Sequence, residues 1–238
     1  MLLPEAIKLK KKRWAIIYPH NMVDYAAVEG FRTRLMTEQP AVDAVYEQIV
    51  PLGQIDGWGI VRWIEDNEVQ AVLSFLFGAD LKDFVTAGRE RGLFDRVQVL
   101  NVLAGQPEDL ALLGEIAPEG WWVTGYPAEG IGYGSHPRFV AQYRKRWGES
   151  PAAGSLYGYT ALMSIAHAVR RAKSTDPEKL IKAFEDLQVP SPLGPLQWRR
   201  DRRSTMGVFV GQLGKSGEHA SMVRWRYETA VRDLPGQH

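Results

Sequence analysis

A strand, a polar loop and a helix follow one another near the N-terminus, and this unit most constrains the fold. Residues 14–18 are almost all apolar, and Pro19 ends the run. Such a run is typical of a strand that is covered on both faces in a parallel sheet. Apolar residues then recur at Val28, Phe31 and Leu35, a spacing that predicts a helix with one buried face.

The same alternation continues through the first half of the chain. Further strands are expected at residues 45–50, 69–77, 97–103 and 121–124, with amphipathic helices between them and a loop over 104–109. Asp80 stands where it would cap the helix that follows the third strand. The pattern predicts an α/β fold with a doubly wound parallel sheet, and it predicts one complete lobe over residues 12–126.

After Pro127 the regular alternation of strands and helices ends, and we place a domain boundary there. The second region covers residues 127–238. A glycine-rich loop leads into a helix that Pro137 opens and Gly148 ends. Strands are expected at 196–199, 206–213 and 224–227. Two more helices are predicted over 156–172 and 178–187, with inner faces formed by Leu162, Ile165, Ala166 and Val169, and by Leu180, Ile181, Phe184 and Leu187.

Composition narrows the possible classes of partner. The formal net charge is +1, which does not favour a nucleic-acid or membrane-surface protein. There is no cysteine, which excludes disulfides, thiolate metal sites and a cysteine nucleophile. No apolar run reaches membrane-spanning length, and the first residues lack the order of a secretory signal, so we expect a soluble chain without an export address.

No catalytic constellation is visible in the sequence. The loop from Gly130 to Gly134 differs from a dinucleotide-binding loop, because its third glycine comes one residue early and no acidic partner follows. We interpret it as an ordinary connection. The 5 histidines show no metal-ligand spacing, and Glu115 and Glu119 are not paired as acid and base. The sequence therefore predicts no catalytic residue, no metal and no cofactor, and it counts against an enzyme.

Aromatic and small residues follow the ends of the predicted strands. In open α/β sheets, ligands bind beyond the carboxyl ends of the strands. An aromatic-walled pocket faced by helix N-termini suits a small carboxylate-bearing molecule. The candidate ligand-binding residues are Tyr18, His20, Asn21, Tyr25, Phe77, Gly78, Ala79, Asp80, Gly105, Gln106 and Tyr126.

Several segments carry a resemblance to a known family, among them WAIIYPHNMVDYAAVEGF, VLSFLFGADLKDFVTAGRERGL and SLYGYTALMSIAHAVRRAKSTDPEKLIKAFEDL. Across residues 12–213 the chain resembles the substrate-binding proteins of ABC importers of the branched-chain amino-acid type, which are type I periplasmic binding proteins. The resemblance implies two α/β lobes, joined by three crossovers, that close over a ligand. It also implies that the N-terminal half of the first lobe is missing, and that the last strands return to the complete lobe.

The resemblance places ligand contacts only loosely. Where the family has an aromatic residue followed by glycine, this chain has Tyr25 and Ala26. Where amino-acid binders have an acidic residue for the amino group, it has Gln106, with Glu108 nearby. These departures weaken an α-amino acid as the ligand and make an aromatic or other organic acid plausible.

The resemblance implies the solute-binding component of an ABC importer, with a membrane permease as partner and a ligand that is amino-acid-like or an aromatic or organic acid. It implies a periplasmic location, although without a signal peptide the chain as it stands is expected in the cytoplasm. In the family the apolar stripes on residues 156–172 and 178–187 pack on strands that this sequence does not contain, which predicts a homodimer or else a complex with a separate N-terminal half. Two alternatives stay open: a cytoplasmic ligand-sensing regulatory domain of the same fold, and an α/β enzyme with an unrecognised site.

Overall fold

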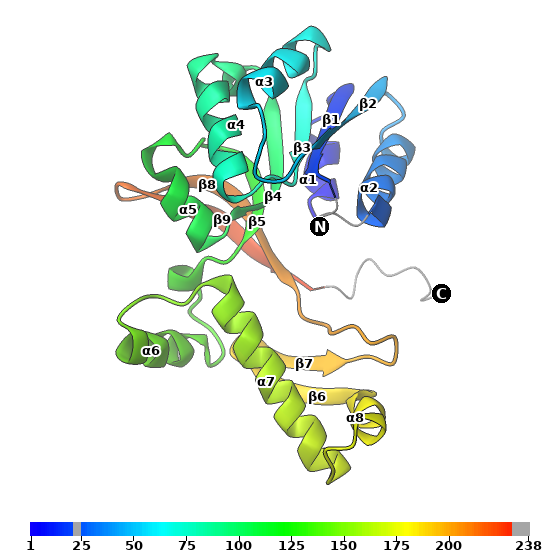
Figure 1. Ribbon diagram of the computed structural model, residues 1–238, viewed down its shortest axis with the longest axis vertical. Helices are drawn as coiled ribbons and strands as arrows, with labels where there is room; N and C mark the ends of the chain where they lie inside the picture. Colours follow the sequence, from blue (N-terminus) through cyan, green and yellow to red (C-terminus); the bar gives the residue numbers. More distant parts are fainter. Residues whose placement is uncertain (21–24, 230–238) are drawn as a thin grey trace. The chain divides into compact units, whose positions relative to one another are not determined.

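The computed structural model describes residues 1–20 and 25–229, and the chain divides into two compact units. The first unit comprises Met1–Tyr126 and Phe209–Arg226. The second comprises Pro127–Val208 and the residues from Tyr227 onward. The chain thus passes from the first unit to the second, returns for one pair of strands, and leaves again (Figure 1).

A seven-stranded sheet with helices around it forms the first unit (Figure 1). Its order is β2-β1-β3-β4-β5-β8-β9, in which β1 to β5 pair in parallel and β8 runs antiparallel to β5. The strands are β1 (Arg13–Pro19), β2 (Ala44–Val50), β3 (Ala71–Ser74), β4 (Gln98–Gly105), β5 (Trp122–Gly125), β8 (Val208–Ser216) and β9 (His219–Glu228). The predicted α/β fold with a doubly wound parallel sheet is confirmed, and β8 and β9 extend it.

The helices of the first unit alternate with these strands as the apolar periodicity predicts. In the third of them Asp56 accepts a hydrogen bond from the Gly59 amide and so caps the helix, while Ile60, Val61 and Ile64 are buried. The helices are α1 (Leu3–Lys8), α2 (Tyr25–Glu38), α3 (Gly57–Asp66), α4 (Gly78–Glu90) and α5 (Pro107–Leu113). Part of the predicted 104–109 loop is therefore helical, because Pro107 opens α5.

Strand β3 is shorter than predicted, and the reason lies in its polar neighbours. It ends at Ser74, whereas the apolar run continues to Phe77. Beyond the strand, the Leu76 amide donates to Ser74 Oγ, and the Leu76 carbonyl accepts from Asn101 Nδ2. At Leu76, hydrogen bonds to the side chains of Ser74 and Asn101 thus replace pairing with a neighbouring strand, and the chain turns toward α4.

The prediction that Asp80 caps α4 is wrong. The helix begins at Gly78, its N-cap residue is Phe77, and Asp80 lies within the first turn. The Asp80 carboxylate instead accepts a hydrogen bond of 2.8 Å from the Gly53 amide, in the loop before α3. It joins α4 to that loop rather than capping its own helix.

The second unit contains three α-helices and a two-stranded antiparallel sheet among its described residues. They are α6 (His136–Trp147), α7 (Ala153–Ala172), α8 (Pro177–Phe184), β6 (Leu187–Ser191) and β7 (Gly194–Trp198). Helix α7 lies across β6 and β7 (Figure 1). The core between them contains Ala168, Ala183, Leu187, Val189 and Leu196.

The predicted inner face of α7 is wrong. The buried stripe is Leu156, Thr160, Ser164 and Ala168, whereas Leu162 is 69% exposed. Thr160 and Ser164 tolerate burial because each hydroxyl donates to the backbone carbonyl four residues earlier.

Ile165 on the same predicted face is 47% exposed. In the following segment Ile181 is 50% exposed, and Leu187 belongs to β6 rather than to the helix. The predicted inner face of the second helix is therefore wrong at Ile181, whereas Leu187 is buried as predicted, although it lies in a strand and not in the helix.

Within the described residues, no helix has both the length and the apolar character needed to cross a membrane.

Candidate functional site

The strand order marks one place in the first unit where ligands of such sheets bind. Strand β1 lies between β2 and β3, so the connections on its two sides run in opposite directions. In open α/β sheets the ligand crevice lies at this reversal, outside the carboxyl ends of the strands. The carboxyl edge, as we name this candidate site, consists of residues 18–20, 25, 77–80, 105–109 and 126.

An aromatic pair stands at the end of β1. Tyr18 is buried and packs edge-to-face against Tyr25, with ring centroids 6.0 Å apart. The Tyr18 hydroxyl donates to Glu47 on β2 at 2.7 Å, so it is held within the protein. Burial raises the pKa of Tyr18, which therefore stays neutral at pH 7. Tyr25 is 52% exposed and presents the free face of the pair.

The structure supports the two remaining candidates after β1, His20 and Asn21, less well as ligand-binding residues. His20 is exposed, and its amide donates to the Val50 carbonyl. Asn21 lies outside the described residues.

Two loops meet where β3 and β4 end. Gly78 has a φ of 56°, which favours glycine, and its amide donates to Asp109 in α5 at 2.7 Å. We expected helix N-termini to face the carboxylate of a ligand. The first amide of α4 instead donates to a carboxylate of the chain, so it is not available to an anionic ligand. Phe77 is half-buried beside it, and Ala79 is exposed.

Gln106 stands between the end of β4 and the start of α5. It is the N-cap residue of α5, and its side chain makes no capping hydrogen bond. Its Oε1 atom is buried and has no hydrogen-bond partner among the described residues. A buried acceptor without a donor carries a cost in free energy, which a ligand donor would remove.

Strands β4 and β5 approach each other closely at their carboxyl ends. The Tyr126 amide donates to the Gly105 carbonyl at 3.1 Å, and Tyr126 is buried. A Cβ atom on Gly125 would lie 2.1 Å from the Gly105 oxygen, so the backbones meet only because both residues are glycine. Gly105 and Tyr126 therefore shape the edge and are not exposed to a ligand.

Asn101 and Ser74 hold the edge in place, and the sequence analysis did not single them out. Both are fully buried. Asn101 Nδ2 donates to Ser74 Oγ and to the Leu76 carbonyl, while its Oδ1 accepts from the amides of Leu103 and Ala104. The sequence does contain a signal for this network, since a lone asparagine within an apolar strand needs buried hydrogen-bond partners.

The polar side chains of the carboxyl edge offer mainly hydrogen-bond acceptors. Asp109, which the sequence analysis also missed, is buried. Burial raises the pKa of its carboxyl above the ordinary 3.8, the Gly78 amide lowers it in part, and the Glu108 charge raises it. Together with Gln106 Oε1, this carboxyl suits a hydroxyl or amino donor on a ligand.

We expect Asp109 to make stability fall as pH rises. A carboxyl whose pKa is higher in the folded state binds its proton more tightly there, so its contribution is full below pH 3.8 and is lost as pH rises through the folded-state pKa. Asp109→Asn retains an acceptor for the Gly78 amide and should remove this slope. Urea unfolding of both proteins at several pH values from 3.5 to about 7 measures it. Equal slopes in the two proteins would contradict the assignment.

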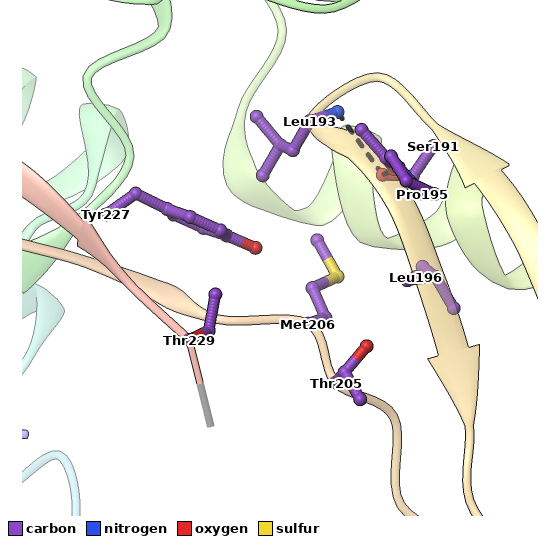
Figure 2. A pocket seen from close by; sticks show the side chains of 9 residues that line it. Ser191, Leu193, Pro195, Leu196, Thr205, Met206, Tyr227 and Thr229 are labelled. Atoms are coloured by element: carbon purple, nitrogen blue, oxygen red, sulfur yellow. Dashed lines mark hydrogen bonds between the residues drawn. The ribbon is translucent and has the colours of Figure 1, made fainter. Parts of the chain in front are cut away.

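A cavity of about 220 Å³ lies in the second unit, and nothing in the sequence analysis indicated it. The ring of Tyr227 and the side chains of Leu193 and Met206 point into it (Figure 2). The Tyr227 hydroxyl accepts from the Gly207 amide at 2.7 Å. Hydroxyl groups and apolar atoms line this cavity, and none of its lining side chains is charged, so it lacks a cation for a carboxylate.

A family model and several solved structures match this chain. The model of the family described as periplasmic binding protein matches residues 2–218. Among solved structures, a solute-binding protein of an ABC transporter from Rhodopseudomonas palustris BisB5, in complex with 3,4-dihydroxybenzoic acid, is 20% identical with a TM-score of 0.81. The match covers 98% of this chain and 64% of that one.

Two further structures give similar results. A solute-binding protein of an ABC transporter from R. palustris, in complex with 4-hydroxybenzoate, is 21% identical (TM-score 0.79; 99% of this chain, 66% of that one). A leucine-binding protein from Thermotoga maritima is 19% identical (TM-score 0.76; 94% and 64%). At these identities the likeness shows the fold, and the chain spans less than two thirds of each structure.

Proposed function

Because this chain belongs to the periplasmic binding protein family, we propose that it is a solute-binding protein of an ABC importer. A membrane permease is then its partner, and the periplasm is its place of action. It binds and delivers a solute rather than converting one, and it needs no cofactor. In this assignment residues 12–126 correspond to the second lobe of the family, and 127–238 to part of the first.

The carboxyl edge is the proposed ligand contact of this chain. The observation that supports this proposal is that aromatic side chains and hydrogen-bond acceptors both follow the strand ends at this edge. Tyr25 and Phe77 offer aromatic surface. Asp109 and Gln106 Oε1 offer acceptors, one of which has no partner among the described residues. Such a mixture of apolar walls and few convergent polar groups is typical of small-molecule sites.

The proposed ligand is a small aromatic acid that carries a hydroxyl group away from its carboxylate. The Gly78 amide is already taken by Asp109, so the edge suits the donor end of the ligand and not its anionic end. Two of the similar structures hold hydroxylated benzoic acids. A neutral hydroxyl is also favoured over a cationic amine, because burial opposes the ionised form of Asp109.

An amino acid is the second candidate, and its ammonium group would have to pair with the same Asp109. If its carboxyl ionises when a ligand arrives, it can pair with an ammonium group. The leucine-binding protein of T. maritima has the same fold. The two candidates differ in which probe binds, and this difference is measurable.

A second copy of the chain belongs to the proposal as a further partner. Leu162, Ile165 and Ile181 are exposed on the second unit, and large apolar side chains gathered on one surface favour a protein interface.

The test is calorimetric titration with 4-hydroxybenzoate, benzoate and leucine at millimolar concentration. We expect 4-hydroxybenzoate to bind most tightly. Of the three probes, only 4-hydroxybenzoate carries a neutral hydroxyl donor at the end of the molecule opposite its own carboxylate. Tyr25→Ala should weaken its binding by about 1–3 kcal/mol, since the exposed ring face is lost.

Tyr159→Ala is the matched control, since Tyr159 is a similarly exposed tyrosine in the second unit, 46% against 52%. It should leave affinity unchanged. If leucine binds more tightly than either benzoate, the aromatic-acid proposal is wrong. If both tyrosine variants bind equally well, the carboxyl edge is not the site.

A further inference from the structure

A series of side-chain contacts leads from the edge strand β2 to the ring of Tyr25. The Tyr25 ring packs edge-to-face on Tyr18, with ring centroids 6.0 Å apart. The Tyr18 hydroxyl donates to one carboxylate oxygen of Glu47 at 2.7 Å, and the other oxygen of Glu47 pairs with Arg32 of α2. Strands β1 and β2 and helix α2 are therefore joined through one carboxylate.

The register of the sheet explains why these side chains meet. Glu47 lies opposite Ile16 on β1, and Tyr18 is two residues further along that strand. Side chains two residues apart point to the same face of a sheet, so Glu47 and Tyr18 share one face. Trp14 lies on this face as well, and its ring packs on Phe31 of α2 with centroids 6.0 Å apart. This is therefore the face that α2 covers.

Helix α2 presents a narrow apolar face to the sheet. Of its 14 residues, two, Val28 and Leu35, are buried. Arg32 follows Tyr25 by two helical turns, so both side chains lie on the same face of the helix. The side chains of Arg32 and Glu47 are 32% and 27% exposed, and this partial burial makes their ion pair stronger than one at the surface. The pair thus fixes α2 on the sheet two turns from Tyr25.

We propose that Glu47 and Arg32 are positioning residues for the ligand, because they fix the Tyr25 ring at the carboxyl edge through Tyr18 and α2. Among the described residues, Tyr18 is the one aromatic side chain that packs on Tyr25, which is itself 52% exposed. An aromatic wall that is already in place loses less freedom when a ligand binds than one that moves. The inference rests on the proposed function of the carboxyl edge, and neither residue has to touch the ligand in this role.

The experiment is a titration of 4-hydroxybenzoate into the isotope-labelled full chain, with dissociation constants taken from amide shifts in nuclear magnetic resonance. Glu47→Ala removes the acceptor of Tyr18 and the partner of Arg32, so it should raise the dissociation constant about three- to tenfold. Arg32→Met keeps the length of the side chain but not its charge, and it should raise the dissociation constant about threefold. This second variant is an independent test should Glu47→Ala not fold.

The readout that separates positioning from a general loss of structure is the effect of both changes in the Tyr25→Ala chain. If Glu47 and Arg32 act through the Tyr25 ring, neither change should weaken binding further once that ring is absent. Glu38→Ala is the matched control, since Glu38 pairs at 3.1 Å with Arg34 and both belong to α2 itself. It should leave the dissociation constant unchanged.

An equal loss of affinity from Glu47→Ala with and without the Tyr25 ring overturns the positioning role. Unchanged affinity in both Glu47→Ala and Arg32→Met also overturns it, and if Tyr25→Ala still weakens binding, the proposed site itself stands. If Tyr25→Ala binds 4-hydroxybenzoate as tightly as the unaltered chain, or if neither protein binds it, the proposed site and this inference both fail.

Discussion

Replacing Asn101 with alanine should lower the free energy of unfolding of the first unit by about 3–5 kcal/mol. The change removes a side chain that makes four hydrogen bonds in a fully buried position. It leaves the amides of Leu103 and Ala104 without their acceptor, and an unmatched buried donor costs about 1–3 kcal/mol. Equilibrium unfolding in urea, followed by tryptophan fluorescence, measures the loss.

Asn67→Ala is the matched control for this change. Asn67 is half-buried at the end of α3, and its side chain donates one hydrogen bond, to the Trp63 carbonyl at 2.8 Å. Its loss should cost about 1 kcal/mol. If the two variants lose the same free energy, the Asn101 network does not hold the carboxyl edge together.

Replacing Gly125 with alanine should destabilise the first unit by about 3 kcal/mol or more. The added Cβ atom would lie 2.1 Å from the oxygen, 2.2 Å from the carbonyl carbon and 2.4 Å from the Cα atom of Gly105. All three are backbone atoms, so β4 and β5 must separate at their carboxyl ends. Thermal unfolding by circular dichroism provides the measurement.

Gly132→Ala is the control for the general cost of changing glycine. A Cβ atom there has nothing within 4 Å, and the backbone has no positive φ. Its unfolding should be unchanged or slightly improved, since alanine restricts the unfolded chain. A Gly125→Ala protein as stable as the unaltered one would mean that the two strands are not packed as described.

The parallel sheet was predictable because each of its inner strands is an almost unbroken apolar run. Residues 14–18 and 71–74 are buried on both faces of the sheet, and a local pattern is sufficient to identify such strands. The antiparallel addition of β8 and β9 depends on pairing between distant segments, with Thr124 opposite Val210. The strands themselves were expected, but their partners were not readable from a local pattern.

Helix α7 shows where periodicity fails. Two apolar stripes share the helix, one built from Leu156 and small residues and one from Leu162 and Ile165. The larger residues predicted the wrong inner face. Thr160 and Ser164 are buried instead, and they tolerate burial because their hydroxyls donate to carbonyls of their own helix. Hydrophobicity alone does not reveal this.

The candidate site was predictable in position but not in chemistry. Strand ends locate Tyr25, Phe77 and Gln106 at one edge, since parallel strands share that edge. The carboxylates followed no local rule, because Asp80 and Asp109 each accept from a backbone amide that is distant in the sequence. Such contacts across the fold decide which amides remain for a ligand, and a single sequence does not show them.

The most direct test of solute binding at the carboxyl edge is a nuclear magnetic resonance titration. Amide shifts of the isotope-labelled chain are followed while 4-hydroxybenzoate is added to millimolar concentration, which detects weak as well as tight binding. We expect the largest shifts at Tyr25, Gly78 and Gln106. Shifts confined to the second unit, or none at all, would contradict it.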